Sequence, residues 1–342
     1  MSKILKFTIA FLLIGSSCQK DDSVTIQETT ISNNKYSGII CLVENAQASP
    51  SIAFNVPYID GVKLRLGWSN VEPINNQFDW TLIDAYVAEA QTLNKQLSIS
   101  IAGGVASPQW LIDLLDSNDF VEVRGNIVPN LWNETYLTEY MEFIEAFGNR
   151  YANDEAVSHI TISGIGFSNE PVIPPPYGTE VLEVWSLAAN QIIETYINSF
   201  DNKPLTLPIH TQIPNQDTWL FFKENILELT YQKSETIGLE YHGLDATASP
   251  TEGTIADNYY NEIKRISDSR HTGYQFVCST IENPVCDPAW VNGSSTNTDN
   301  LLQRTLEAGI ANGADFIEVY ANDCSNPSYF DMFKTVSETL KK

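Results

Sequence analysis

The sequence predicts an α/β protein with a single (β/α)8 barrel over residues 36–342. The main observation is that eight short β-rich runs alternate with amphipathic helical stretches over about 305 residues. No Gly-rich phosphate-binding turn follows the first run, which disfavours an open doubly wound sheet. No internal repeat or shift in composition divides this region, so we expect one domain.

The expected elements follow one another in the order that a barrel requires. The strands are expected at Gly38–Val43, Val62–Gly67, Leu97–Ala102, His159–Gly164, Leu205–His210, Ile237–His242, Tyr274–Ser279 and Phe316–Tyr320. The helices are expected at Trp80–Leu93, Thr135–Tyr151, Val181–Phe200, Trp219–Leu229, Tyr259–Ser267 and Asn300–Asn312. Each strand is therefore followed by a helix or a long loop.

Aliphatic and polar residues alternate along three of these strands, at 62–67, 97–102 and 205–210. Side chains along a strand point alternately to opposite faces, so the aliphatic face is expected to meet the helices and the polar face to point into the barrel. Small Ser and Thr residues would simply fill the core. For the charged Arg65 and Glu240, burial without a partner is costly, so we favour a role in building a site.

The charge of the chain restricts its partners. Its 342 residues include 19 basic and 43 acidic residues, for a formal net charge of −24. This balance argues against nucleic-acid binding, which needs clustered Lys and Arg, and disfavours a polyanionic substrate. With 43% hydrophobic residues the composition is that of a globular protein. After the N-terminus no 18 consecutive residues are apolar, which excludes a polytopic membrane protein.

Residues 1–18 have the pattern of a secretory signal: two lysines, an apolar run at Phe7–Ile14 and small residues before Cys18. The cysteine after small residues resembles a bacterial lipoprotein signal, which implies that Cys18 is lipidated and becomes the N-terminus. Asp21-Asp22 resembles the surface-export signal of some Gram-negative bacteria. We therefore expect a lipid anchor in the outer membrane or at the cell surface, with residues 19–35 as a flexible tether. An ordinary cleaved signal remains the alternative, because Gly15 stands where a lipobox usually has Leu.

Four other cysteines would then lie in a compartment that permits disulfides: Cys41, Cys278, Cys286 and Cys324. A bridge between Cys286 and Cys324, both expected in late loops, is plausible, and the pairing stays open. The chain has four His and no zinc-ligand spacing, so we expect neither a metal nor a cofactor.

The fourth expected strand runs into Asn169-Glu170-Pro171. The carboxyl ends of the strands build the active site of a (β/α)8 barrel. At this place the tripeptide resembles the Asn-Glu pair of the retaining glycoside hydrolases with (β/α)8 barrels. The resemblance implies that Glu170 is the general acid/base and that Asn169 contacts the 2-hydroxyl of a sugar.

A second stretch resembles family 42 β-galactosidase-like enzymes. It contains Arg65 and Trp68 at the end of the second strand, then Glu72-Pro73 and Phe78-Asp79-Trp80. The loop 107–111, which contains Pro108 and Trp110, resembles the Pro-x-Trp loop of the same enzymes. Sugar rings stack on aromatic side chains, so Arg65, Trp68 and Trp110 are candidate substrate contacts, whereas Trp80 is expected in the core.

Glycoside hydrolysis needs a second carboxylate, and the sequence does not single one out. The resemblance implies a nucleophile at the end of strand seven, where Gln275 faces inward and no acid precedes Glu282. We rank Glu318 first, Glu240 second and Glu282 third. Glu318 could equally be a core ion pair with Arg65 or Lys63. A Glu170–Glu318 pair separated by more than about 5.5 Å would allow inversion instead of retention.

Further substrate contacts are expected near the ends of strands five, six and eight. The candidates are His210, Tyr241, His242, Tyr320, Asn322 and Asp323. The loop 172–177 is rich in Pro and is expected to form the wall of a subsite or a rigid rim.

The sequence thus predicts a hydrolase of O-glycosidic bonds in a neutral oligo- or polysaccharide. The alternative is a non-catalytic glycan-binding lipoprotein on a degenerate barrel. An esterase is disfavoured, because no Gly-x-Ser-x-Gly motif is present. The sugar, the linkage and the oligomeric state stay open.

Overall fold

The computed structural model of the chain describes residues 36–44, 49–123, 125–173, 177–210, 216–245, 255–280 and 301–342. The chain divides into two units, Met1–Lys35 and Tyr36–Lys342, and every described residue belongs to the second. The account below therefore concerns the second unit alone.

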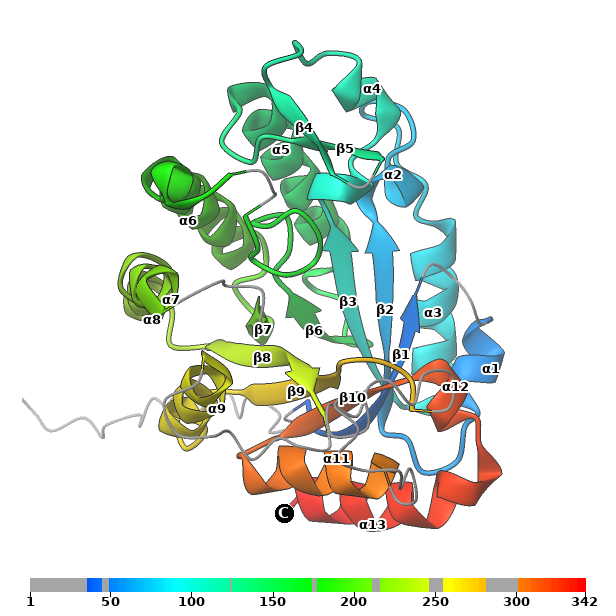
Figure 1. The fold of residues 1–342 in the computed structure, drawn as a ribbon. Helices are drawn as coiled ribbons and strands as arrows, with labels where there is room; N and C mark the ends of the chain where they lie inside the picture. The colour runs from blue at the N-terminus through cyan, green and yellow to red at the C-terminus, as the bar shows by residue number, and fades with distance from the viewer. Residues whose placement is uncertain are drawn as a thin grey trace, which may run out of the picture. The chain divides into compact units, whose positions relative to one another are not determined.

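Eight parallel strands close into a barrel in the order β1-β10-β9-β8-β7-β6-β3-β2 (Figure 1). The barrel strands are β1 (Gly38–Glu44), β2 (Gly61–Gly67), β3 (Gln96–Ala102), β6 (Val157–Thr161), β7 (Leu205–Ile209), β8 (Ile237–Leu244), β9 (Thr272–Phe276) and β10 (Phe316–Tyr320). This confirms the single (β/α)8 barrel that the alternating pattern predicts.

Helices surround the barrel (Figure 1). The long helices are α3 (Thr81–Leu93), α5 (Glu134–Tyr151), α6 (Leu182–Ser199), α9 (Ile255–Ile266), α11 (Leu301–Ala311) and α13 (Phe330–Leu340). A continuous helical segment between β7 and β8 consists of α7 (Gln216–Phe222), a π-helical turn (Lys223–Leu227) and α8 (Glu228–Lys233). The short helices are α1 (Pro50–Phe54), α2 (Trp68–Val71), α4 (Gln109–Ile112) and α12 (Ala321–Cys324), with 3-10 turns at Gly104–Ala106, Thr179–Val181 and Pro327–Tyr329.

The ends of two helices show how local sequence sets their limits. The side chain of Asn133 caps α5 by accepting a hydrogen bond from the backbone N–H of Tyr136 at 3.0 Å. At the other end of α3, Asn94 adopts a left-handed conformation with φ 49°, which Asn tolerates better than most residues. These caps agree with the helix limits that the periodicity predicts.

Several observed elements differ from the expected ones. The fourth barrel strand ends at Thr161, earlier than expected, because Gly164 has φ +83° and turns the chain away. An antiparallel hairpin of β4 (Phe120–Val123) and β5 (Asn126–Pro129) lies in the connection after β3, and it was not expected. The helix α13 was not expected either, although it packs against β1. Both omissions are of short or terminal segments.

The polar face of the strands points into the barrel, as the alternation predicts. Ser98 Oγ lies 2.8 Å from His159 Nδ1, and Thr206 Oγ1 lies 3.0 Å from His159 Nε2. The ring of Tyr36 stacks on His159 with 4.4 Å between centroids. The aliphatic residues of the same strands, by contrast, belong to the apolar layer beneath the helices.

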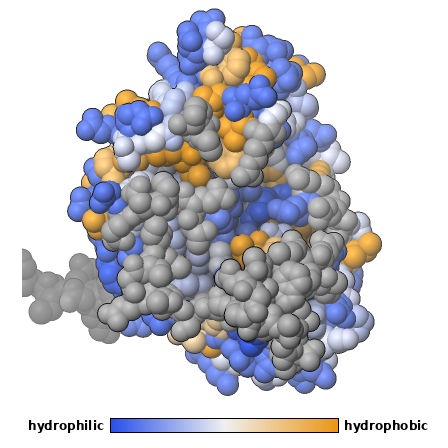
Figure 2. Space-filling view, in the orientation of Figure 1, coloured by the Kyte–Doolittle hydropathy of each residue, from blue (hydrophilic) through white to orange (hydrophobic). Residues whose placement is uncertain are grey.

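Among the described helices, none combines the length and hydropathy that crossing a membrane would need. Figure 2 shows hydrophilic residues at the centre of one face and hydrophobic residues gathered in its upper part. In that part Figure 1 shows α4 and the β4–β5 hairpin. Exposed hydrophobic residues of this region are Leu114, two residues after α4, and Ile127 on β5.

Candidate active site

Glu170 lies in a tight turn after β6, and two glycines allow that turn. Gly164 has φ +83°, and a Cβ on it would lie 1.9 Å from the ring of Tyr140. A Cβ on Gly166 would lie 1.6 Å from the carbonyl oxygen of Glu170. The backbone N–H of Val172 donates to that same oxygen at 2.8 Å. Because only glycine fits both positions, the local sequence fixes where the Glu170 side chain starts.

The Glu170 carboxylate has two hydrogen-bond partners at the carboxyl end of the barrel. Ser168 Oγ donates to Oε2 at 2.5 Å, and His242 Nδ1 lies 3.0 Å from Oε1. The side chain is 16% exposed. Burial alone would raise the pKa of Glu170, but the hydrogen bond and charge of His242, with help from Arg65 and Ser168, hold this pKa well below its usual range. Glu170 is therefore an ionised carboxylate in the free protein.

His242 lies between two carboxylates. Its Nδ1 faces Glu170, and its Nε2 contacts Glu240, two residues earlier on β8. Burial alone would lower the pKa of His242, but the two carboxylates raise it above the ordinary value. The surroundings therefore favour the imidazolium form, in which both ring nitrogens carry a proton.

Glu240 is fully buried in the barrel and accepts hydrogen bonds on both oxygens. Lys63 Nζ donates to Oε1 at 2.7 Å. The hydroxyls of Thr161 and Thr206 donate to Oε2 at 3.1 and 2.6 Å. Burial alone would raise the pKa of Glu240, but Lys63 and His242 hold it well below the usual range. Glu240 is thus an anion that hydrogen-bond donors of the protein stabilise in place of water.

Lys63 joins Glu240 to a second buried acid. Its Nζ lies 2.9 Å from Glu318 Oε1, in an orientation that makes an ion pair but not a hydrogen bond. Burial raises the pKa of Glu318; Lys63 opposes this shift and the Glu240 carboxylate adds to it. Glu240, His242 and Glu318 bring ligand-type atoms within 4.8 Å of one another. The Lys63 ammonium supplies positive charge there and joins the two carboxylates in an ion-pair network.

Arg65 lies at the mouth of the barrel and links several strands. Its Nη1 donates to Glu44 Oε1 at 2.7 Å, and its Nη2 donates to Gln275 Oε1. Burial alone would lower the pKa of Arg65, but the charges of Glu170 and Glu44 raise it. Burial also raises the pKa of Tyr320 to about 12, with Arg65 opposing. Arg65 is thus a fixed positive charge between two carboxylates.

Glu318 and Glu240, expected as candidates for the second catalytic carboxylate, do not lie at the mouth of the barrel. Both side chains are fully buried and paired with Lys63. The sequence placed both on the inward face correctly but did not give their depth. The open possibility of an ion pair between Glu318 and Lys63 is the one observed. Glu282 lies outside the described residues.

Trp68 and Tyr241 do not face a substrate either. Trp68 is fully buried, and its indole N–H donates to Glu72 Oε2 at 2.7 Å. Tyr241 points away from the barrel interior, between Glu240 and His242 on the strand, and stacks on Tyr259 with 5.2 Å between centroids. Both expectations fail for the same reason, since these rings are part of the layer beneath the helices.

Asp323 and the cysteines also differ from expectation. Asp323 is buried and accepts hydrogen bonds from the backbone N–H of Thr280, at 2.9 Å, and from its hydroxyl, so it anchors a loop. Cys324 carries a free thiol, so the expected Cys286–Cys324 bridge is wrong. Cys278 is disulfide-bonded, and Cys41 is a buried free thiol.

The remaining predicted residues lie around the mouth. Burial lowers the pKa of His210, at the end of β7, while the nearby Glu170 opposes the shift. Trp110 is partly buried, and its indole N–H donates to the Glu72 carbonyl at 2.9 Å. Asn169 Oδ1 is buried without a hydrogen-bond partner in the described structure. Tyr320 is the last residue of β10, and Asn322 lies on α12, which begins directly after it. The loop residues 174–176 and Cys18 lie outside the described residues.

Sequence reasoning missed Glu44, an acid at the mouth. Its side chain is 30% exposed, and it lies beside Arg65 because β1 and β2 pair in the register Glu44–Arg65. The expected strand ended one residue earlier, at Val43. An acid directly after an apolar first strand, in a barrel whose strand ends build the site, is the signal that would have found it.

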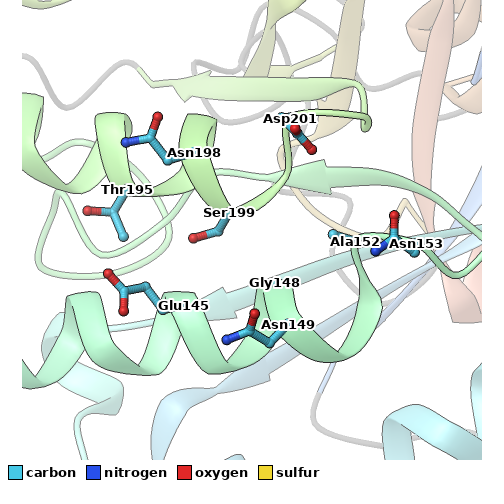
Figure 3. A pocket seen from close by; sticks show the side chains of 9 residues that line it. All are labelled: Glu145, Gly148, Asn149, Ala152, Asn153, Thr195, Asn198, Ser199 and Asp201. Atoms are coloured by element: carbon cyan, nitrogen blue, oxygen red, sulfur yellow. The ribbon is translucent and has the colours of Figure 1, made fainter.

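A polar surface cavity lies elsewhere, between α5 and α6. Figure 3 shows side chains of both helices lining it, among them Glu145, Asn149 and Asn198. Its volume is about 420 Å³. It adjoins the carboxyl ends of the two helices, and helices run back against the strands in this fold, so it opens at the barrel end opposite to Glu170. We assign no part of the chemistry to it.

Several solved structures with a similar fold are glycoside hydrolases. A β-galactosidase from the psychrophilic Marinomonas ef1 superposes with a TM-score of 0.58 and 10% identity, over 88% of this chain and 59% of that one. Xylanase 10B from Thermotoga petrophila RKU-1, in complex with xylobiose, gives 0.56 and 11%, over 89% and 95%. Xylanase 10B from Thermotoga maritima gives 0.54 and 10%, over 89% and 96%.

This chain thus spans less than two thirds of the β-galactosidase and nearly all of the two xylanases. Comparison with protein-family models and with curated proteins returns no match. At identities of 10–11% the likeness concerns the fold. The chain has the (β/α)8 barrel that these glycoside hydrolases have.

Proposed function

We propose that the protein hydrolyses O-glycosidic bonds of a neutral oligo- or polysaccharide, with Glu170 as general acid/base. The observation that carries the proposal is the position of the Glu170 carboxylate. It is partly exposed at the carboxyl end of the fourth barrel strand, hydrogen-bonded by Ser168 and His242. In this fold the strand ends hold the reacting groups.

Asn169 supports the proposal. Its Oδ1 is buried without a hydrogen-bond partner among the described residues, although buried polar atoms are nearly always paired. A sugar hydroxyl beside Glu170 would donate to this oxygen. The high net negative charge of the chain also fits a neutral glycan better than an acidic one.

Glu44 is our candidate for the second carboxylate. Two carboxylates must flank the scissile bond, about 5 to 9.5 Å apart according to the mechanism. Glu44 and Glu170 both lie at the mouth of the barrel, and the charges of both raise the pKa of Arg65. The substitution Glu44→Gln keeps the size and can still accept from Arg65, so loss of turnover in this variant would assign Glu44 to the reaction.

The substrate screen starts from the activities of the enzymes with this fold. Xylo-oligosaccharides, β-1,4-xylan and β-galactosides come first, followed by a wider panel of plant and algal glycans, with analysis of the released sugars. The resemblance of the stretch from Arg65 to Trp80 to family 42 enzymes favours the β-galactosides. A finer choice of sugar is left to this screen.

The variant Glu170→Gln tests the catalytic role. It should lower kcat by at least about 100-fold, the scale of general acid–base catalysis, while leaving the fold intact. Glu183→Gln is the matched control, because Glu183 is an exposed carboxylate on α6. Unchanged hydrolysis by Glu170→Gln on a substrate of the wild-type protein would refute the assignment.

A non-catalytic glycan-binding protein is the second candidate, and Gln275 favours it. This amide occupies the inward face of β9, the seventh barrel strand, where it accepts from Arg65. A carboxylate there would complete the retaining pair that the resemblance implies. Tight oligosaccharide binding by the wild-type protein without released reducing ends would support this candidate and exclude hydrolysis.

We also propose that the protein is exported and anchored through a lipid on Cys18. The proposal rests on the signal pattern of residues 1–18, which lie outside the described structure. Labelling of the full-length protein with a radioactive or clickable fatty acid should be lost in Cys18→Ser. Equal labelling of this variant, or none of the wild type, would refute the anchor.

A further inference from the structure

We propose that Glu240 is a positioning residue that keeps the reaction's proton on His242 Nδ1, in contact with Glu170. The proposal rests on the proposed role of Glu170. It assigns a function to a buried ion pair that the reaction scheme of two carboxylates does not need. Three features of the structure carry it.

The first feature is that both ring nitrogens of His242 face carboxylate oxygens. Nδ1 lies 3.0 Å from Glu170 Oε1, and Nε2 contacts Glu240 Oε1. A neutral imidazole has only one N–H, so one of its contacts would set a lone pair against an anionic oxygen. With the ring 1% exposed, water cannot relieve such a contact. While both carboxylates are ionised, the two contacts are therefore compatible only with a doubly protonated ring.

The second feature is that Glu240 is held in its ionised form. Apart from His242, three donors point at its two oxygens: the Lys63 ammonium and the hydroxyls of Thr161 and Thr206. A protonated Glu240 would have to give up one of these bonds to make room for its own O–H. Because the carboxylate is anionic and accepts four donors, it fixes the orientation of the ring as well as its charge.

The third feature is the balance of the other charges around the ring. Besides the two direct partners of His242, His210 after β7 and Glu318 on β10 interact with its charge. On β2, Lys63 contacts Glu240, and the charge of Arg65 acts on Glu170. The cations among them disfavour the imidazolium, whereas the carboxylates in direct contact favour it. The raised pKa of His242 indicates that the direct contacts prevail.

The proton step follows from this arrangement. When a glycan covers Glu170 and removes its water, the Nδ1 proton passes to Glu170 Oε1, and neutral His242 keeps its Nε2–H on Glu240. Glu170 then gives that proton to the glycosidic oxygen as its bond to the anomeric carbon breaks. The water that adds to the anomeric carbon loses a proton, which returns to Glu170 and from there to His242 Nδ1. One water is consumed, and the protein regains its starting charge.

The experiment reads the protonation of His242 directly by ¹⁵N NMR of the whole protein between pH 5 and 8. The chain has four His, so assignment with single His→Gln variants is practical. We expect both His242 nitrogens to be protonated at pH 6 in the wild type, because the two carboxylates raise the pKa of the ring. In Glu240→Gln the proton affinity of His242 should fall at least tenfold, and Glu240→Asp should restore part of it.

Glu262→Gln is the matched control. Glu262 is also a buried carboxylate in an ion pair, with Lys223 at 3.1 Å, but it lies on α9, outside the barrel. This variant should leave the titration of His242 unchanged. A singly protonated His242 in the wild type at pH 6, or an unchanged titration in Glu240→Gln, would overturn the proposal.

These outcomes are independent of turnover. If the protein hydrolyses no glycan and His242 still titrates as expected, the proposed function is refuted, but Glu240 still keeps a proton on His242 Nδ1. If hydrolysis is found, the alkaline limb of the kcat/KM profile, where His242 loses its proton, should move to lower pH in Glu240→Gln but not in Glu262→Gln. Should Glu240→Gln fail to fold, the wild-type spectrum alone decides, because a singly protonated ring refutes the proposal.

Discussion

Lys63 is the position where one substitution tests the buried network most directly. Its ammonium lies inside the barrel, 2.7 Å from Glu240, 2.9 Å from Glu318 and 2.6 Å from the Thr161 hydroxyl. The substitution Lys63→Met keeps most of the volume and removes the charge. It leaves two fully buried carboxylates with the positive charge of His242 as their nearest compensation.

The expected loss of stability is large. Removing one partner of a buried ion pair costs about 3 to 5 kcal/mol, because the remaining charge stays buried and uncompensated. Protonation of Glu318, whose pKa burial already raises, would limit the loss to the lower part of this range. A domain has about 5 to 15 kcal/mol of stability, so the variant should still fold at low temperature.

The measurement is urea unfolding at pH 7, followed by tryptophan fluorescence and circular dichroism, for the wild type, Lys63→Met, Glu318→Gln and the double variant. We expect the double variant to be more stable than Lys63→Met, because it removes one uncompensated carboxylate. A loss below about 1 kcal/mol in Lys63→Met, within the range of an exposed ion pair, would refute the reasoning.

Three further outcomes follow from individual contacts. The pKa of Glu318 is higher in the folded than in the unfolded state, so its contribution to stability is present at low pH and is lost as pH rises above about 4.5. The stability of the wild type should therefore fall relative to that of Glu318→Gln between pH 4.5 and 7. If the two proteins show the same pH dependence, this reasoning is contradicted. Gly164→Ala should lower the free energy of unfolding by roughly 2 to 4 kcal/mol, through backbone strain and overlap with the ring of Tyr140. Gly125→Ala, at φ +81° with open space around its Cβ, should lower it by about 1 kcal/mol. Equal losses of stability in thermal unfolding would be inconsistent with the overlap. Trp68→Phe should lower the free energy of unfolding by about 1 to 2 kcal/mol, because the hydrogen bond to Glu72 is lost. The affinity for a glycan, measured by calorimetry, should stay unchanged. Weaker binding would show that Trp68 contacts the substrate.

The sequence by itself determined the fold and the direction of most strand side chains. Alternation along 62–67 places Lys63 and Arg65 inside the barrel and Leu64 beneath the helices, as observed. The same rule puts Tyr241 outside, between the inward Glu240 and His242, so its assignment to the site went against the periodicity. Both results depend only on the period of two along a strand, which is a local property.

Only the tertiary structure decided which charges meet and how deep they lie. Glu240 is 177 residues from Lys63, and Glu170 is 72 residues from His242, so no local pattern joins them. Glu318, Glu240 and Glu44 all belong to barrel strands, yet only Glu44 reaches the mouth, where the register of β1 against β2 brings it to Arg65. The stagger of the strands around the barrel sets the height of each residue along the axis, and that height separates a buried ion pair from a carboxylate that a substrate can touch.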